Sequence, residues 1–337
     1  MIRRVLILVN TGTPDSPEVK DVRKFLSEFL NDGRVIDLPW LIRKILVDLI
    51  IVPFRSRRSA GVYRKLWTKD GSPLLVNLEN LISGLKKMTG NKYEVHGAMR
   101  YGNPSLKEIL GKIKRENYDE IIVFPLYPQY ASSTTGSVFD LVMGEIVNWN
   151  FTPSVRLISQ YYSHPSCIEA FSSNIMLYDP QSYDHILFTY HSLPVRHINK
   201  IHPEISAYRC DCNEMMTKHG KFCYRATCYE TTRLIANKLN LNSGKHSTSF
   251  QSSLNRSWLS PYTDQVLRKL ASEHKQRVLV VAPSFVADCL ETIIEIQDEY
   301  KSLFQKAGGK ELVMVKSLND SNAWINAILE ITEFSNV

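Results

Sequence analysis

Several features that would place this chain in a common functional class are missing from its sequence. No apolar run reaches the ~20 residues that a membrane-spanning helix needs, because charged residues interrupt each run earlier. The N-terminus passes from two arginines directly into an apolar stretch at residues 5–9, without the pattern of a secretory signal peptide. The turn at residues 11–13 lacks the later glycines of a dinucleotide-binding loop, which argues against NAD as a cofactor. We therefore expect a cytoplasmic protein.

Positive charge is in modest excess and is scattered along the chain. The net charge is +7 at pH 7, and no basic block alternates with aromatic residues. Nucleic acid is therefore not an expected partner. The excess instead suggests an anionic surface or an anionic substrate.

Strand-like runs alternate with amphipathic helical stretches along the whole chain, which predicts an α/β fold of parallel sheets covered by helices. At 337 residues the chain is long enough for two similar Rossmann-like lobes. We expect a four-stranded parallel sheet in each lobe and an active-site cleft between the lobes. The expected boundary near residues 149–153 separates an N-terminal lobe (1–150) from a C-terminal lobe (151–337). The expected strands are residues 5–9, 93–99, 120–124, 154–159, 184–190, 247–251, 277–282 and 311–316.

Four acidic residues follow the strand-like run at residues 278–281. They are Asp288, Glu291, Glu295 and Glu299, and their spacing of three, four and four places them on one face of a helix. Like charges in a row repel one another unless a cation or protons lie among them. The stripe begins at the end of a strand, where open α/β folds have their sites. It predicts a path for a hard divalent cation, with a solvated acidic helix face as the alternative.

A single histidine ends another strand-like run. His191 follows residues 184–190, and Pro194 prevents the strand from continuing. An imidazole facing Glu291 across a cleft could bind a metal or transfer protons near neutral pH. The alternative is a histidine with a purely structural role.

Five segments resemble the ferrochelatase family, in order and in spacing. Residues 188–194 are similar to the signature around the family's histidine, and residues 284–292 to the start of its metal-site helix. Residues 8–14, 127–137 and 258–264 resemble the N-terminal loop, the central loop and a late tryptophan motif. Together the five segments span nearly the whole chain.

This resemblance implies the same two-lobed fold and a lyase that inserts Fe2+ into protoporphyrin IX. The product would be protohaem, in the terminal step of haem biosynthesis. His191 and Glu291 would be the catalytic and metal-binding residues, and Asp288, Glu295 and Glu299 would form the metal path. The residues expected to contact the porphyrin are Thr11, Arg100, Tyr101, Tyr130, Ser132, Thr134, Pro194 and Trp258.

Two positions depart from the family pattern. Thr11 stands where members acting on coproporphyrin usually carry tyrosine and protoporphyrin-type members an apolar residue, so it favours protoporphyrin only by lacking the tyrosine. Cys289 stands where some members carry histidine. The alternatives left open are a coproporphyrin ferrochelatase and a non-catalytic haem- or metal-binding protein on the same fold.

Residues 34–58 form an unusually apolar segment, with Arg55, Arg57 and Arg58 at its end. The resemblance implies that this segment is the lip of the porphyrin cleft. An apolar face followed by arginines also suits contact with an anionic membrane, which would make the protein peripheral at the inner face of the membrane. The remaining alternative is a core helix. We call residues 34–58 the lip segment.

Four of the six cysteines are closely spaced, at Cys210, Cys212, Cys223 and Cys228. Without a secretory signal, disulfides are not expected. Four thiols within 19 residues suit a [2Fe–2S] cluster or a structural Zn2+. The first spacing is unusual for zinc, and some bacterial ferrochelatases carry a [2Fe–2S] cluster in this region, so the cluster is favoured. Four free thiols are the alternative.

Overall fold

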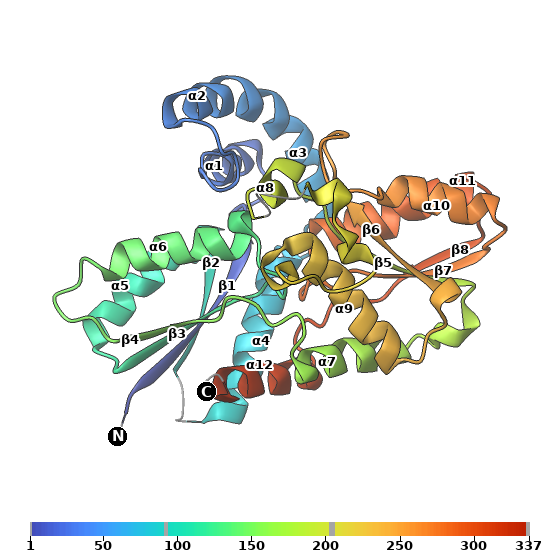
Figure 1. Cartoon of the computed structure of the whole chain (residues 1–337). Coiled ribbons are helices and arrows are strands. Elements are labelled where there is room, and N and C mark those ends of the chain that lie inside the picture. Colours follow the sequence, from blue (N-terminus) through green and yellow to red (C-terminus); the bar gives the residue numbers. More distant parts are fainter. Residues whose placement is uncertain (1, 91–93, 202–205, 335–337) are drawn as a thin grey trace. The chain divides into compact units, whose positions relative to one another are not determined.

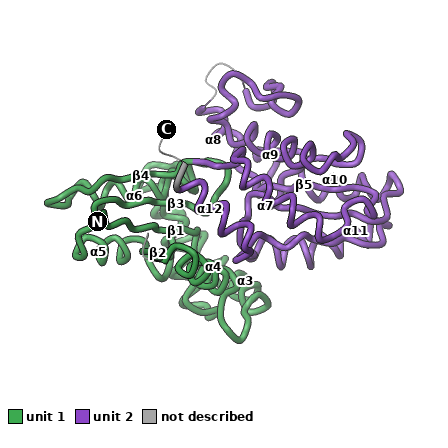
Figure 2. Tube along the Cα trace, turned by 90° about the horizontal axis from the view of Figure 1, so that it is seen from below, with its two compact units in different colours: residues 1–159 green, residues 160–337 purple. Residues whose placement is uncertain are grey.

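A computed structural model of the chain describes residues 2–90, 94–201 and 206–334. Tyr93, the expected first residue of the second strand, lies outside the described residues. Two compact units divide the chain, Met1–Ser159 and Gln160–Val337 (Figure 2). Each unit contains one four-stranded sheet in which all strands are parallel, with helices packed against it (Figure 1). The predicted fold class is confirmed.

The strands of the first unit are β1 (Arg4–Thr13), β2 (Glu94–Gly102), β3 (Glu120–Pro125) and β4 (Ser154–Leu157), in the order β2-β1-β3-β4. β4 pairs with β3, so the first unit extends past the expected boundary at residue 150 and ends at Ser159. The helices of this unit are α1 (Val19–Leu30), α2 (Trp40–Ile45), η1 (Leu46–Ile51), α3 (Val52–Leu66), α4 (Pro73–Thr89), α5 (Leu106–Glu116), η2 (Ser132–Gly136) and α6 (Ser137–Ile146).

The second unit repeats this strand order with β5 (His185–His191), β6 (His246–Gln251), β7 (Arg277–Val281) and β8 (Glu311–Met314), as β6-β5-β7-β8. Its longer helices are α7 (Pro165–Met176), α9 (Tyr224–Lys238), α10 (Thr263–Ser272), η8 (Glu291–Tyr300) and α12 (Asn322–Phe334). Its short helical elements are η3 (Pro180–Ser182), α8 (Val195–Asn199), η4 (Ala207–Arg209), η5 (Asp211–Asn213), η6 (Gly220–Phe222), η7 (Ser243–Lys245) and α11 (Lys301–Lys306).

The central strands are buried on both faces, as their near-continuous apolar sequences require. In β1, residues 5–9 are fully buried. Val5, Ile7 and Val9 pack with α5 and α6 in one core cluster. Successive side chains of a strand point to opposite faces, so Leu6 and Leu8 face the other side, where α4 lies against β1 and β2.

Local sequence signals set the ends of several helices. Ser105 caps α5, because its hydroxyl accepts a hydrogen bond from the backbone N–H of Glu108. The same helix ends at Asn117, which adopts the left-handed conformation with φ of 54°. α4 begins with Pro73, whose missing N–H is not needed in the first turn.

Three helical elements are π-helices, in which backbone hydrogen bonds join residues five apart. They are η1 in the lip segment, η2 in the central loop and η8, which carries most of the acidic stripe. The spacing of the acids had suggested an α-helix. Single π-turns occur often at functional sites, and each of these three lies in a segment singled out by sequence.

Candidate active site

His191 is the last residue of β5, the central strand of the second sheet. It is half-buried, and its ring lies beside those of Trp258 and Phe285, with centroids 6.4 and 6.3 Å away. Its Nδ1 is 2.6 Å from the carbonyl oxygen of Ser192. A carbonyl can only accept, so Nδ1 carries the proton and Nε2 is the basic nitrogen of the neutral ring.

Pro194 and Trp258 lie together just beyond this strand. The two residues form an isolated antiparallel bridge, which fixes the loop after β5 against the loop after β6. Pro194 is buried and Trp258 is half-buried. The structure therefore brings Trp258 and His191, two residues selected from distant motifs, into one site.

Gln251 links His191 to the acidic helix, and sequence reasoning missed it. It is the β6 residue opposite His191 in the ladder. Its side-chain Nε2 donates to the backbone oxygen of Glu291 at 3.4 Å and to Glu295 at 3.2 Å. Glu291, the first residue of η8, is half-buried and is hydrogen-bonded by the thiol of Cys289. Burial and the Glu291 carboxylate raise the pKa of Cys289 well above its usual value.

The other members of the acidic stripe have different environments. Asp288 is buried, and its carboxylate accepts from the backbone N–H of Ser317 and the side chain of Asn319 at 3.1 and 2.8 Å. It therefore ties the start of the acidic helix to the loop after β8. Glu299 is exposed and lines a surface depression together with Asp298 and the cations Arg268 and Lys306.

Glu295 is the most heavily hydrogen-bonded carboxylate of the stripe. Besides Gln251, its donors are the backbone N–H of Ser252 at 2.9 Å, the Ser252 hydroxyl at 2.5 Å and the Tyr300 hydroxyl at 2.8 Å. Ser252 has a φ of +59°, an uncommon conformation for a serine. The carboxylate thus holds the strained start of the loop that leads to Trp258. Across the described ranges, no group of three or more His, Cys, Asp or Glu side chains is arranged to hold a metal ion.

In the first unit, the predicted porphyrin contacts lie at the carboxyl ends of the strands. Thr11, near the end of β1, is hydrogen-bonded through its hydroxyl to the Tyr127 hydroxyl at 2.8 Å, which joins the end of β1 to the residues after β3. Gly12 follows with a φ of +122°, and a Cβ there would lie 1.8 Å from the carbonyl oxygen of Tyr101. Only glycine allows β1 and β2 to approach this closely at their ends.

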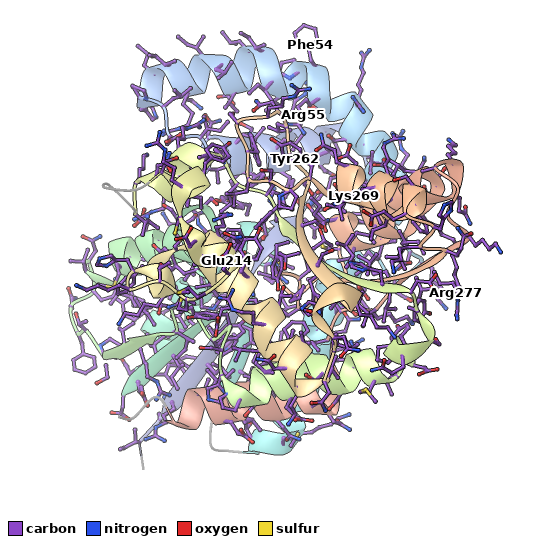
Figure 3. All side chains as sticks on the ribbon, turned by 45° about the vertical axis from the view of Figure 1, so that its right-hand side comes forward. Phe54, Arg55, Glu214, Tyr262, Lys269 and Arg277 are labelled. Carbon is purple, nitrogen blue, oxygen red and sulfur yellow. The ribbon has the colours of Figure 1, made fainter. Side chains whose placement is uncertain are left out.

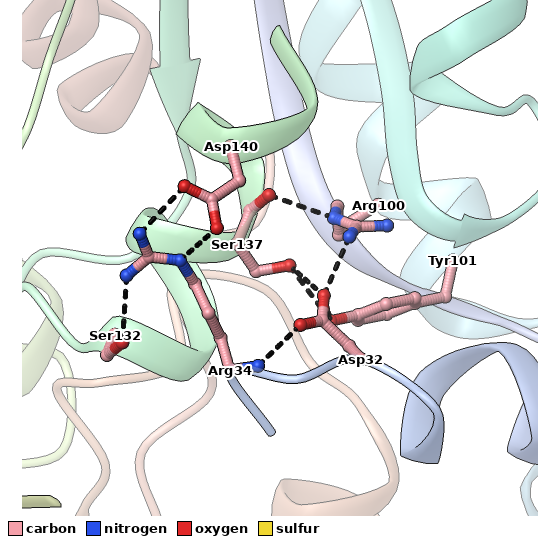
Figure 4. A network of polar contacts seen from close by, with 7 residues as sticks. All are labelled: Asp32, Arg34, Arg100, Tyr101, Ser132, Ser137 and Asp140. Atoms are coloured by element: carbon pink, nitrogen blue, oxygen red, sulfur yellow. Dashed lines mark hydrogen bonds and ion pairs between the residues drawn. The ribbon is translucent and has the colours of Figure 1, made fainter. Parts of the chain in front are cut away.

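Arg100 and Tyr101 meet at a carboxylate that sequence reasoning did not select (Figure 4). Asp32, in the turn before the lip segment, accepts from the Arg100 guanidinium at 2.6 Å and from the Tyr101 hydroxyl at 2.9 Å. The Ser137 hydroxyl and the backbone N–H of Arg34 also donate to it, at 2.5 and 2.7 Å. Burial alone would raise the pKa of Asp32, but these donors and the Arg100 charge together lower it.

A second pair continues this network toward the surface. The Arg34 guanidinium binds both oxygens of Asp140 and donates to the Ser132 hydroxyl at 2.9 Å (Figure 4). Of the other central-loop residues, Tyr130 is half-buried, and the Thr134 hydroxyl donates to the carbonyl of Ala131. The central loop, β2 and the turn before the lip segment are therefore held as one polar unit.

Comparison with known proteins assigns the family. The ferrochelatase family profile matches residues 3–335. Ferrochelatases of Legionella pneumophila (strain Lens) and Pseudomonas entomophila (strain L48) are 39% and 38% identical to the chain, over 98% and 99% of both sequences. A ferrochelatase of Coxiella burnetii (strain CbuK_Q154) is 39% identical over 98% of the chain and 93% of its own length. The chain belongs to the ferrochelatase family. It is therefore an enzyme, a lyase of haem biosynthesis.

Solved chelatases with little sequence similarity share the fold. The sirohydrochlorin chelatase SirB of Bacillus subtilis subspecies spizizenii, solved with cobalt, has a TM-score of 0.54 at 8% identity and covers 98% of the chain. CbiX, described as the terminal enzyme of sirohaem biosynthesis in denitrifying bacteria, has a TM-score of 0.50 at 11% identity, covering 99%. At these identities the likeness concerns the fold alone.

The four clustered cysteines of this ferrochelatase are all buried and reduced. The thiols of Cys210 and Cys223 lie next to that of Cys212, whose sulfur accepts from the Arg225 guanidinium at 2.8 Å. The contact with Cys212 lowers the pKa of Cys223. Cys228 is buried one turn inside α9. The donors have the right chemistry for an iron–sulfur cluster, but in the described segments they do not surround one point as cluster ligands do.

The lip segment of this ferrochelatase presents a largely exposed apolar surface. One side is anchored: Val47 and Val52 are buried against α1, and Asp48 accepts from Ser27 and Asn31. The other side points into solvent, and Phe54 extends away from α3 with 78% of its surface exposed (Figure 3). The core-helix interpretation is therefore wrong for this side. The exposed large apolar residues are Leu38, Trp40, Leu41, Ile42, Ile45, Leu49, Ile50 and Phe54.

The two ion pairs of Figure 4 should contribute unequally to stability. The side chains of Asp32 and Arg100 are only 8% and 16% exposed, so Asp32→Ala leaves a largely buried cation unpaired and should cost ~3 kcal/mol or more. Asp140→Ala removes the partner of a more exposed arginine and should cost less than ~1 kcal/mol. Urea unfolding of the two variants measures the difference. Equal losses would mean that Asp32 is not the centre of the network.

Proposed function

We propose that this ferrochelatase inserts Fe2+ into protoporphyrin IX and forms protohaem. The insertion replaces two pyrrole N–H protons with one metal ion, so two protons must leave while the ion loses its water ligands. The observation that best supports the proposal is the hydrogen bond between Nδ1 of His191 and the carbonyl oxygen of Ser192. The Nδ1 proton is committed to Ser192, which leaves Nε2 as a proton acceptor at the end of the central strand.

We propose Glu291 as the partner of His191. Gln251 pairs with His191 in the β5–β6 ladder, and its side chain donates to the backbone oxygen of Glu291, the first residue of the acidic helix. An imidazole nitrogen and a carboxylate oxygen can each accept a pyrrole proton or bind Fe2+. Ferrous iron is the substrate of this reaction, so a permanent cage of ligands is not required.

Glu299 and Glu295 are proposed as the outer steps of the metal path. Glu299 is exposed where the ion would arrive, and Glu295 lies one step inward. Hydrogen bonds from neutral donors already occupy Glu295, so an ion would have to displace Tyr300 or Ser252 to bind there. Asp288 belongs to the same proposed path, and its fixed carboxylate supports a role in holding the helix start.

We assign protoporphyrin rather than coproporphyrin on the residue at position 11. Thr11 does not supply the tyrosine hydroxyl that members acting on coproporphyrin usually carry at this position. Its own hydroxyl is already hydrogen-bonded to Tyr127. The other proposed porphyrin contacts are Arg100, Tyr101, Tyr130, Ser132, Thr134, Pro194 and Trp258. Of these, Tyr101 is fully buried and its hydroxyl is engaged by Asp32, which supports a role in shaping the pocket wall.

Substitutions should separate the reaction centre from the metal path in an anaerobic assay of Fe2+ insertion. His191→Ala and Glu291→Gln should each lower kcat by ~10²–10⁴-fold, because each removes a positioned proton acceptor. Glu299→Gln should raise KM for Fe2+ while changing kcat less, since the residue lies outside the centre. Full activity of His191→Ala would refute the proposed mechanism. Coproporphyrin III used more efficiently than protoporphyrin IX would refute the substrate assignment.

The lip segment is proposed to hold the edge of the porphyrin and to touch an anionic membrane from the cytoplasmic side. Its exposed apolar residues are followed by Arg55, Arg57 and Arg58, the pattern of an interfacial helix. Phe54 and Arg55 follow one another in α3 (Figure 3). Among the described helices, none is long and apolar enough to cross a membrane.

A triple variant of the lip segment tests this contact. Leu49→Ser, Ile50→Ser and Phe54→Ser together should abolish sedimentation with phosphatidylglycerol-containing vesicles. Burial of each apolar side chain in the membrane would contribute ~1.5–3 kcal/mol to the free energy of binding. The fold should survive, since all three are exposed. The matched control changes Met143, Val147 and Phe151, three exposed apolar residues of the same unit, to serine. Equal vesicle binding by both variants would contradict the membrane contact, and an unchanged KM for porphyrin would contradict the porphyrin lip.

We also propose a [2Fe–2S] cluster on Cys210, Cys212, Cys223 and Cys228. The burial of four thiols within one short segment and the contacts of Cys212 with two others support it. Bound there, the group would cross-link the segment before α9 to that helix. Because the described thiols do not surround one point, the segment would have to tighten on cluster binding.

Metal analysis of anaerobically purified protein tests the cluster. About two irons per chain with matching acid-labile sulfide are expected, and Cys228→Ser should lose both. Cys167→Ser, which removes a buried cysteine outside the segment, is the control and should retain them. Zinc in place of iron, or four freely alkylated thiols in folded, active protein, would refute the cluster.

A further inference from the structure

The backbone of His191 lies beyond the part of β5 that is paired on both sides. The ladder with β6 continues to His191 and Gln251, but the ladder with β7 ends three residues earlier, at Phe188 and Val281. On the β7 side, the polar backbone groups near His191 therefore need other partners, because a buried backbone group without one is costly.

Two hydroxyl groups supply those partners. The backbone N–H of His191 donates to Ser284 Oγ at 3.3 Å, and the Tyr224 hydroxyl donates to the His191 carbonyl at 2.9 Å. The two hydroxyls therefore hold the two ends of one residue, Ser284 at the His191 N–H and Tyr224 at the His191 carbonyl.

These two contacts join three parts of the second unit. Ser284 follows β7, Tyr224 is the first residue of α9, and His191 ends β5. Tyr224 is buried, so its hydroxyl has little access to water as a substitute partner. Neither Tyr224 nor Ser284 was selected from the sequence as a site residue, and the activity described above assigns no role to either.

The conformation of this peptide decides what the imidazole does. Nδ1 of His191 donates to the carbonyl of the very next residue, Ser192, at 2.6 Å. That bond forms only if the backbone torsion angles between the two residues keep the Ser192 carbonyl oriented toward the imidazole. Ser192 is fixed from its own side, because its N–H donates to the carbonyl of Gln251 and its hydroxyl to the carbonyl of Leu259. The Ser284 and Tyr224 hydroxyls fix the backbone on the His191 side.

We propose that Tyr224 and Ser284 are positioning residues for His191. They hold its peptide so that Nδ1–H stays on the Ser192 carbonyl and Nε2 remains the proton acceptor aimed at the substrate. The role rests on the proposed function of His191 as a base. Neither hydroxyl touches the reacting atoms, so losing one should lower kcat and leave the KM values for porphyrin and Fe2+ in place.

Tyr224→Phe, compared with Tyr190→Phe, is the first test. Tyr190 precedes His191 in the same strand and is also buried, and its hydroxyl bonds Thr232 at 2.9 Å instead of the His191 backbone. The two changes remove the same chemical group from similar surroundings. Tyr224→Phe should lower kcat by about 10- to 100-fold, the effect of a small misplacement of a catalytic group. Tyr190→Phe should leave kcat unchanged.

Ser284 provides a second test that does not involve the cysteine segment. The Tyr224 hydroxyl also contacts the thiol of Cys228, so Tyr224→Phe alone could act through that cysteine. Ser284→Ala removes the acceptor of the His191 N–H and should lower kcat to a similar degree. Ser284→Thr keeps a hydroxyl and should retain most of the parent kcat. NMR of 15N-histidine-labelled protein, with His191→Ala used for assignment, should show a single Nδ1–H tautomer in the parent and a mixture in both Tyr224→Phe and Ser284→Ala.

The possible results separate the positioning role of Tyr224 and Ser284 from the role of His191 as a base. Full activity in His191→Ala would refute the role of His191 as base. An inactive His191→Ala combined with equal kcat in Tyr224→Phe and Tyr190→Phe would refute the positioning role alone. A single unchanged tautomer in Ser284→Ala would refute it as well, whatever happened to activity.

Discussion

The strand order shared by the two sheets is the constraint on which the site depends. In each unit the first strand of the sheet lies inside, with the second strand on one side and the third on the other. The chain connections therefore diverge at the carboxyl end of that first strand, and open α/β sheets bind ligands at such a point. Thr11 and His191 both lie there, one in each unit.

Parallel pairing also leaves the end of the central strand only partly satisfied. The ladders on its two sides stop at different residues, so the peptide of His191 needs side-chain partners from other segments. Ser284 and Tyr224 meet this need in the second unit. Where the sheet stops supplying hydrogen bonds, side chains from two other segments supply them and hold the peptide of His191.

Several carboxylates in this enzyme connect separate segments of the chain through hydrogen bonds. Asp32 gathers four donors from three segments, and Glu295 gathers four from two. Asp288 joins the acidic helix to the loop after β8. Each is used where an irregular backbone needs its N–H groups or side chains held. An acidic residue near the site is therefore not by that fact a metal ligand, and its donors decide which role it can take.

Much of the fold was predictable because its signals are local. The run at residues 120–124 became β3 almost without change, since buried parallel strands read as short apolar or β-branched runs between turns. The run at residues 247–251 became β6 in the same way, although it is more polar. The expected boundary at residue 150 was too early. β4 is short and only half-buried, and nothing in its own sequence says that it pairs with β3. Nor does the spacing of the acidic residues distinguish a π-helix from an α-helix, because residues four apart share a face in either.

The sequence alone determined the family, the alternation of strands and helices, and the choice of His191 and Glu291, because these depend on residue identity and spacing. Only the tertiary structure decided which hydrogen bonds those groups make and how exposed each one is. It committed Nδ1 of His191 to Ser192, surrounded Glu295 with donors and left Glu299 exposed. It also brought in Asp32, Tyr224, Gln251 and Ser284, whose partners lie as far as 105 residues away in the chain. Hydrogen bonds between distant segments exist only once the chain has folded, so no local pattern could have announced them.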